Sequence, residues 1–179
     1  MDDHDRYKPM TGDDDFPQTA RHVMRGAGTA VLSTIDRETG APYGSLVLSA
    51  CLPDATPVVL ISTLAEHTRN AMENPAASIL FDGTAGLEEP LTGPRVTAVG
   101  RLEPTEDAAA RTRFLARHPG AEGYADFADF GFWRLTVERA HLVAGFGKIA
   151  WIDAADALLG TEDAAELAAS EADIVEHMN

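Results

Sequence analysis

The segment from Ile61 to Phe81 contains the residues of this chain that are best suited to hold an anion. Its pattern predicts a strand ending at Ser62, a helix that opens at Thr63, and then a second strand. The start of a helix leaves backbone N–H groups without partners and carries a partial positive charge, so it can bind a phosphate. The hydroxyls of Ser62 and Thr63 would add donors there, and His67 and Arg69 would add cationic ones.

The same residues also fit a helix start that needs no ligand. Thr63-Leu-Ala-Glu66 matches the Ser/Thr-x-x-Glu capping box, in which two side chains satisfy the first backbone donors. Glu66 would then compete with an anion for those donors. His67 and Arg69 are two positions apart and face different sides of a helix, so either can be a solvated surface residue. Both interpretations stay open on the residues alone.

Other candidate groups are scattered along the chain. Lys148 follows Gly145-Phe-Gly147, where the two glycines free the backbone for an unusual turn, and it could meet an anion. The aromatic residues between Tyr124 and Trp133 are typical of core packing, or of a flat wall for an aromatic cofactor. We expect Cys51 to be a small buried residue. The sequence has no zinc-binding motif and no nucleophile elbow, which favours chemistry carried by a bound cofactor.

Net charge is unevenly distributed along the 179 residues, which total −15. Residues 1–15 hold six acids against two basic residues, and residues 153–179 hold eight acids with no Lys or Arg. The body between them is therefore close to neutral and offers no clustered basic surface for nucleic acid. The sequence contains no apolar run long enough to span a membrane and only one cysteine, which together indicate a cytoplasmic protein without a membrane partner.

The chain divides into three expected parts: a flexible acidic leader (1–15), one domain (16–152) and an acidic helical segment (153–179). The domain is rich in β-branched runs separated by turn residues, with helices inserted. We expect a mainly β protein with peripheral helices, built as a six- to seven-stranded antiparallel split β-barrel. The expected strands are Thr29–Ile35, Pro42–Cys51, Val58–Ser62, Ala77–Phe81, Arg95–Leu102, and a last pair, Phe132–Val137 and Ala140–Phe146, around a Glu138-Arg139 turn. The expected helices are Ala20–Gly26, one from Thr63 to Asn74, and one that Thr105 caps and that ends near Arg117.

With these motifs in order, the chain resembles the pyridoxamine 5′-phosphate oxidase-like, FMN-binding split barrels, and within them the haem-utilisation branch. The matching pieces span residues 20–152 in the same order as in that family. Residues 174–179 resemble the opening of a small helical domain that often follows this barrel. The matching pieces are Ala30–Asp36, Gly40–Pro42, Ser45, Ile61–Leu80, Arg113–Pro119, Tyr124, Asp129-Phe130, Arg134-Leu135 and Gly145–Trp151.

The resemblance implies a homodimer in which each of two symmetric clefts takes FMN from both subunits. It also implies an oxidoreductase in which the flavin carries the electrons. Pyridoxamine oxidases have an arginine where Ser45 stands and a lysine near His67, and this chain shows no Arg-x-His counterpart near its end. It therefore does not predict pyridoxamine oxidase activity. The residues that would hold the FMN phosphate and ribityl chain are Ser45, Ser62, Thr63, His67, Thr68, Arg69 and Asn70, with Lys148 as an added candidate.

Two further hypotheses follow from the resemblance. In the haem-utilisation branch a histidine near the C-terminus can bind haem iron, and His177 is the residue here that could do so by position. This predicts haem binding or haem breakdown. The remaining hypothesis is a module that keeps the barrel and binds no cofactor, because the basic phosphate-binding pair is missing.

Overall fold

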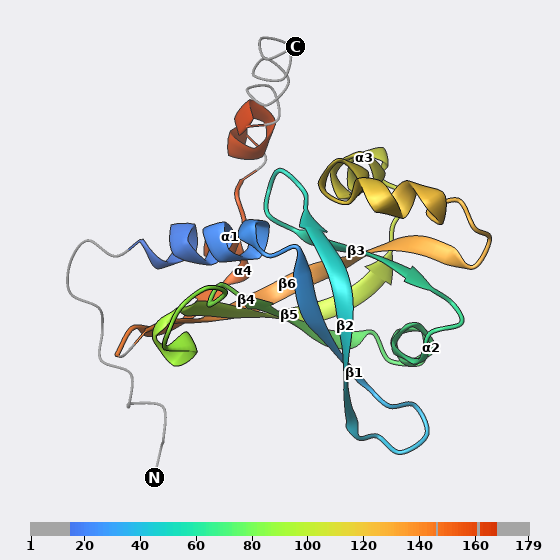
Figure 1. Cartoon of the computed structure of the whole chain (residues 1–179), viewed down its shortest axis with the longest axis horizontal. Helices are drawn as coiled ribbons and strands as arrows, with labels where there is room; N and C mark the ends of the chain where they lie inside the picture. Colours follow the sequence, from blue (N-terminus) through green and yellow to red (C-terminus); the bar gives the residue numbers. More distant parts are fainter. Residues whose placement is uncertain (1–14, 146, 161, 168–179) are drawn as a thin grey trace.

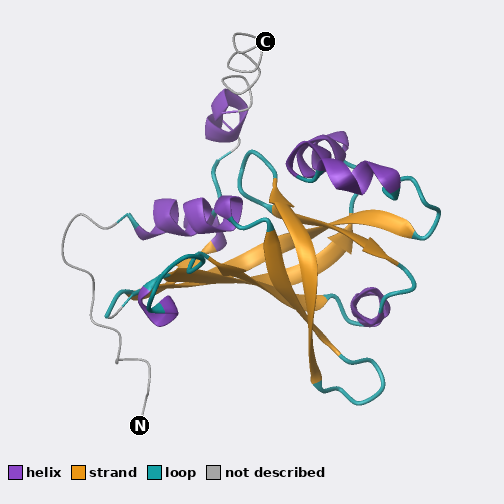
Figure 2. Ribbon diagram, in the orientation of Figure 1, coloured by secondary structure: helices purple, strands orange, loops and turns teal. Residues whose placement is uncertain are grey.

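The computed structural model describes residues 15–145, 147–160 and 162–167. His177 and most of the expected acidic leader lie outside these residues. Figures 1 and 2 show a strongly curved sheet with helices around its outside. The elements, in chain order, are α1 (Phe16–Gly26), β1 (Thr29–Ile35), β2 (Pro42–Cys51), β3 (Pro57–Ser62), α2 (Glu66–Glu73), β4 (Ala76–Asp82), η2 (Pro90–Thr92), β5 (Pro94–Pro104), α3 (Ala108–Arg117), η3 (Pro119–Gly123), β6 (Phe130–Ala144), β7 (Ile149–Asp153) and α4 (Ala154–Ala157).

The strands form one antiparallel sheet that closes on itself. Their order is β3-β2-β1-β4-β5-β6-β7, and β3 also pairs with β6, so six strands make a barrel and β7 extends it at one edge. The closing ladder runs from Val58 opposite Arg134 to Ser62 opposite Phe130. This confirms the predicted mainly β, split-barrel architecture with peripheral helices.

Side chains alternate between the inside and the outside of the barrel along each strand. On β1, Ala30 and Leu32 are buried in the core while Val31 between them is partly exposed. Helix α1 adds its own apolar face to the same core, with Val23 and Met24 buried against the barrel interior. A second, smaller cluster lies between α3 and the strands β2 and β3. The outward positions of the strands are therefore left to form surfaces and clefts.

Most of the predicted strands are confirmed, and β1 and β2 have the predicted bounds. The last predicted pair is wrong, because residues 130–144 form one continuous strand with no turn at Glu138-Arg139. The ladder with β5 shifts register between Val99 and Gly100, so Glu138 is an extra residue in a β-bulge. Strand β7, which pairs along the end of β6, was not predicted.

The helices differ from the predictions mainly where they begin. Helix α1 begins at Phe16, because the Asp15 side chain accepts a hydrogen bond of 2.8 Å from Gln18 N–H. Helix α3 ends at Arg117 as predicted, but Asp107 caps it in place of Thr105. Helix α2 begins at Glu66, and the described residues give its start no side-chain cap. The predicted capping box at Thr63 is therefore wrong.

Candidate functional site

An apolar stripe crosses the outer face of the barrel on three neighbouring strands. Val31 on β1, Leu46 on β2 and Leu80 on β4 point outward and are 38%, 74% and 37% exposed. Exposed apolar side chains are common singly, but a contiguous group of them marks a binding surface. Two clefts lie along this stripe, and Leu46 lines both of them.

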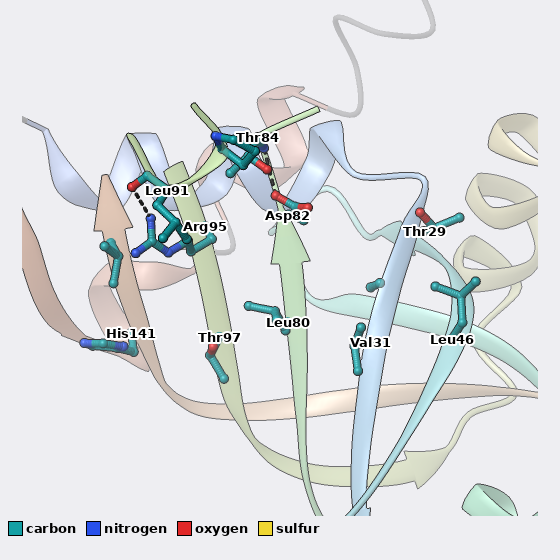
Figure 3. Close-up of a pocket in the computed structure, with 13 residues that line it drawn as sticks. Thr29, Val31, Leu46, Leu80, Asp82, Thr84, Leu91, Arg95, Thr97 and His141 are labelled. Carbon is teal, nitrogen blue, oxygen red and sulfur yellow. Dashed lines mark hydrogen bonds between the residues drawn. The ribbon is translucent and has the colours of Figure 1, made fainter. Parts of the chain in front are cut away.

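The larger cleft, of about 630 Å³, lies over β1, β4, β5 and β6 beside the loop that contains η2 (Figure 3). The guanidinium of Arg95 reaches into its rim and donates hydrogen bonds to the carbonyls of Leu91 (2.9 Å) and Gly93 (3.2 Å). Asp82 lies nearby, and its hydrogen bonds from Thr84 are the main reason that its pKa falls below the usual value. The cleft thus combines apolar walls with one cation and one carboxylate at its edge.

His141 on β6 lies at the rim of the large cleft. Its ring stacks on Trp151 of β7 with 4.6 Å between centroids, and the Arg139 guanidinium lies 4.3 Å from the Trp151 ring. Desolvation, helped by the positive charge of Arg95, lowers the pKa of His141 below its usual value, so the ring is neutral near pH 7. Its Nε2 is buried and has no hydrogen-bond partner among the described residues.

The smaller cleft, of about 360 Å³, lies over β2 and β3 and is called the histidine cleft below because His67 lines it. Its remaining surface is mostly apolar and aromatic, with Leu48, Leu60, Tyr124 and Phe130 among the lining residues. Tyr124 and Phe130 also contact each other, with ring centroids 5.0 Å apart. The predicted aromatic wall is therefore partly present, although Phe127 and Phe132 do not line it.

His67 on α2 is held against the barrel by a hydrogen bond with Ser45 on β2. Ser45 Oγ lies 3.0 Å from His67 Nδ1, and the same hydroxyl lies 3.4 Å from the carbonyl oxygen of Leu32. Burial lowers the pKa of His67 below its usual value. Burial therefore disfavours the cationic form that a phosphate contact would use, and the neutral form of the imidazole is a competent ligand for a metal.

The corner at the end of β3 is occupied by the protein's own groups. Ser62 Oγ donates to Asp129 Oδ2 at 2.5 Å and accepts a hydrogen bond from Leu64 N–H at 3.0 Å. The backbone N–H of Thr63 donates to the Asp129 carbonyl at 2.7 Å. The hydroxyl predicted to hold phosphate is therefore engaged, and a carboxylate stands beside it.

The remaining residues of the predicted corner point in different directions. Thr68 and Asn70 are fully buried, and the Asn70 amide accepts from Arg37 N–H (3.1 Å) and donates to Thr34 Oγ1 (3.2 Å). Arg69 is 44% exposed and lies 3.7 Å from the Glu66 carboxylate. Asn70 therefore connects α2 to β1 and to the loop that follows it, and Arg69 faces solvent.

Lys148 lies in the turn between β6 and β7, where its carbonyl accepts from Ala144 N–H at 2.8 Å. The Ser62 corner is paired with Phe130, at the other end of the fifteen-residue β6. Within one chain the structure therefore does not bring Lys148 to that corner. It brings Ser45 together with His67, and it joins the Ser62 hydroxyl and the Thr63 backbone N–H to Asp129.

Sequence reasoning missed three polar residues of this face: Asp129, Arg95 and His141. Asp129 stands within a matched motif, but its contact with Ser62 joins positions 67 apart and has no local signal. Arg95 and His141 occupy outward positions on neighbouring strands, and only the pairing register places them at one cleft. The described residues contain no group of three or more His, Cys, Asp or Glu that could hold a metal ion.

A closed six-stranded antiparallel barrel with an apolar outer face and clefts on it defines a split β-barrel protein. Comparison with family models matches residues 12–157 to the family described as CREG, beta-barrel, so the chain belongs to the CREG β-barrel family. A protein of the pyridoxinephosphate oxidase family from Clostridium acetobutylicum shares the fold, with a TM-score of 0.59 and 14% identity over 79% of this chain and 96% of its own.

Two other proteins are more similar to this chain in sequence, and both have haem in their names. The chloroplastic HOZ of Arabidopsis thaliana, named as an unconventional heme oxygenase, is 36% identical over 129 residues. The match covers 70% of this chain and 39% of HOZ. A heme-binding protein from Mycobacterium smegmatis is 31% identical with a TM-score of 0.76, over 83% of this chain and 61% of that protein. The chain thus spans only part of each relative, and the family resemblance to the haem-utilisation branch is confirmed.

Among the helices of the described residues, none combines the length and the apolar character needed to cross a membrane.

Proposed function

We propose that this chain binds haem on the outer face of its barrel. The observation that carries the proposal is that two adjoining apolar clefts, joined at Leu46, each include a neutral histidine with a buried, unpartnered Nε2 among the described residues. Neutral imidazole is a common axial ligand of haem iron. An apolar face beside such a ring suits a porphyrin better than it suits a phosphate.

The residues of this face match the three chemical parts of haem. Val31, Leu46 and Leu80 offer an apolar wall for the macrocycle, and Arg95 at the rim offers a cation for a propionate. A histidine offers the donor for iron. When bound, haem supplies an iron centre that exchanges electrons and binds oxygen. The names of HOZ and of the mycobacterial heme-binding protein support this assignment. Haem breakdown and ligation by His177 remain predictions.

The test is a haemin titration of the purified protein followed by absorbance. We expect a saturable Soret band distinct from that of free haemin. A Leu46→Glu variant places a charge where both clefts meet and should weaken haemin binding at least tenfold. The matched control is Met72→Glu, because Met72 is 65% exposed on α2 and lines neither cleft. No Soret change in the wild-type protein, or equal affinities for the two variants, would contradict the proposal.

The homodimer implied by the family resemblance belongs to the same proposal. In such a dimer the cofactor would lie between two subunits, so a second copy would cover haem on the side opposite Val31, Leu46 and Leu80. Light scattering on the wild-type protein and on Leu46→Glu, without haemin, separates loss of a dimer from loss of haem binding. A wild-type monomer would refute the dimer.

FMN is the second candidate, and the aromatic pair Tyr124 and Phe130 in the histidine cleft favours it as a wall for the flavin ring. The Asp129 carboxylate at the Ser62 corner opposes a phosphate there. Calorimetry with FMN tests whether the flavin binds. Heat of binding at micromolar FMN would support an FMN-dependent oxidoreductase. A folded protein that binds neither FMN nor haemin is the cofactor-free module.

A further inference from the structure

We propose that His67 ligates haem iron through Nε2 and that Ser45 fixes the orientation of its ring. This inference rests on the proposed function, because it names the residue at which haem would be bound. It assigns iron ligation to the barrel itself, in addition to or in place of the C-terminal His177.

We assign to His67 the tautomer with the proton on Nδ1, because it lets the Ser45 hydroxyl bond to both of its neighbours. Ser45 Oγ has one hydrogen, and the Leu32 carbonyl oxygen 3.4 Å away can only accept. If the Ser45 hydroxyl donates to that carbonyl, it must accept from Nδ1–H of His67 at 3.0 Å. The proton then lies on Nδ1, and Nε2 carries the lone pair. Histidines that bind metals use this arrangement, in which the second nitrogen donates to a neighbouring group.

Among the residues that the structure describes, none donates a hydrogen bond to His67 Nε2. Nε2 is buried and has no hydrogen-bond partner among the described residues, although a buried polar nitrogen is normally satisfied. The cleft that His67 lines supplies Leu48, Leu60 and Phe130, which are apolar. Burial also disfavours the protonated ring, so the lone pair is kept near neutral pH. An unpaired imidazole lone pair beside an apolar cleft fits the iron of a largely apolar cofactor.

His141 is the competing residue in the other cleft, and its surroundings differ. Its ring stacks on Trp151, and Figure 3 shows it turned away from Leu80 and Val31 in the cleft. No hydroxyl or carbonyl holds its Nδ1 among the described contacts, and the Arg95 charge is close enough to influence it. His67 is therefore the better-oriented donor.

The experiment compares haemin complexes of the wild-type chain with His67→Gln, His141→Gln and His177→Gln variants. Glutamine keeps a polar side chain of similar reach, so the fold is preserved, and circular dichroism with thermal melting checks this. We expect His67→Gln to lose the iron–histidine stretching band in the resonance Raman spectrum of the ferrous complex. We also expect its haemin affinity to fall at least tenfold, and added imidazole to restore the band. The other two variants should keep it.

Ser45→Ala gives a readout that a purely structural role for His67 would not move. It removes the acceptor for Nδ1–H, so the iron–histidine band should shift while haemin still binds, with affinity lowered about 10- to 100-fold. If His67→Gln keeps the wild-type band and affinity while His141→Gln or His177→Gln loses them, the inference is wrong and haem binding stands. If the wild-type chain itself gives no Soret band, both fail together.

Discussion

Ser62 Oγ and Asp129 Oδ2 lie 2.5 Å apart, and this contact ties the end of β3 to the segment that leads into β6. The Asp129 carbonyl accepts from Thr63 N–H in the same place, so the two segments are joined twice. The contact uses the hydroxyl that a phosphate would need and adds a negative charge beside it. The corner is therefore better suited to joining strands than to holding an anion.

Replacing Asp129 with Asn should destabilise the protein by about 1 kcal/mol, because the Ser62 hydroxyl would then donate to a neutral acceptor instead of a charged one. This corresponds to a fall in Tm of roughly 2–4 °C for each kcal/mol in a protein of this size. The control is Asp126→Asn, since the Asp126 side chain is 77% exposed in its ion pair with Arg111 and should contribute little. Equal melting temperatures for the two variants would show that the Ser62 contact is not important for stability.

Asn70 is expected to act as a structural residue. Asn70→Ala leaves the Arg37 N–H and the Thr34 hydroxyl without their partner and should cost about 2–3 kcal/mol in urea unfolding. Asn74→Ala at the exposed end of the same helix removes a hydrogen bond to Ala76 N–H and should cost less than about 1 kcal/mol. A small effect at Asn70 would instead point to a residue kept for ligand binding.

Gly100 is required by the β-bulge. A Cβ at this position would lie 2.0 Å from the carbonyl oxygen of Thr136, which is backbone and cannot move aside. Gly100→Ala should therefore cost about 3 kcal/mol or more, or prevent folding. Gly44→Ala on β2 is the matched control, because the nearest atom to its Cβ would be Val31 Cγ1 at an ordinary 3.7 Å. Similar Tm values for both variants would refute the strain at the bulge.

Cys51 should be chemically inert in the folded protein. Burial raises the pKa of its thiol to about 12 from an ordinary value of 9.0, although Arg25, Arg117 and Arg113 act in the opposite direction. The folded state thus holds the proton where the unfolded state releases it, so this part of the stability is complete below pH 9 and is lost as pH rises from 9 to 12. We expect no reaction with a disulfide reagent at pH 8 until denaturant is added, and a flatter alkaline stability profile for Cys51→Ala. Rapid labelling of the folded protein would contradict this.

The sequence predicted the barrel because its early strands carry strong local signals. Thr29–Ile35 and Pro42–Cys51 are β-branched or alternating runs bounded by glycine, proline and charged turn residues, and their bounds were confirmed. Local signals failed where the deciding contact is distant. The Glu138-Arg139 pair resembles a turn, but pairing with β5 keeps the strand continuous and absorbs Glu138 in a bulge. The Thr63 capping box failed because Asp129, far along the chain, takes the backbone and hydroxyl groups of this corner.

The candidate site was predicted less completely than the fold. Ser45 and His67 were both named, and the structure brings them to 3.0 Å, but as a neutral hydrogen-bonded pair. Thr68 and Asn70 were named from the family resemblance, and the structure buries both side chains, which helix position alone does not reveal. The large cleft could not be predicted, since it depends on the register that places Thr97 opposite His141 and on the packing of the loop beside it.

Strand β6 also sets the order in which the chain can complete its sheet during synthesis. The free edges of β3 and β5 both wait for the same partner, residues 130–144, so they stay open until that stretch has left the ribosome. A nascent chain that stops before Phe130 exposes two unpaired strand edges at once, which makes it prone to join other chains. Both of these strand edges are therefore closed by one and the same stretch, residues 130–144.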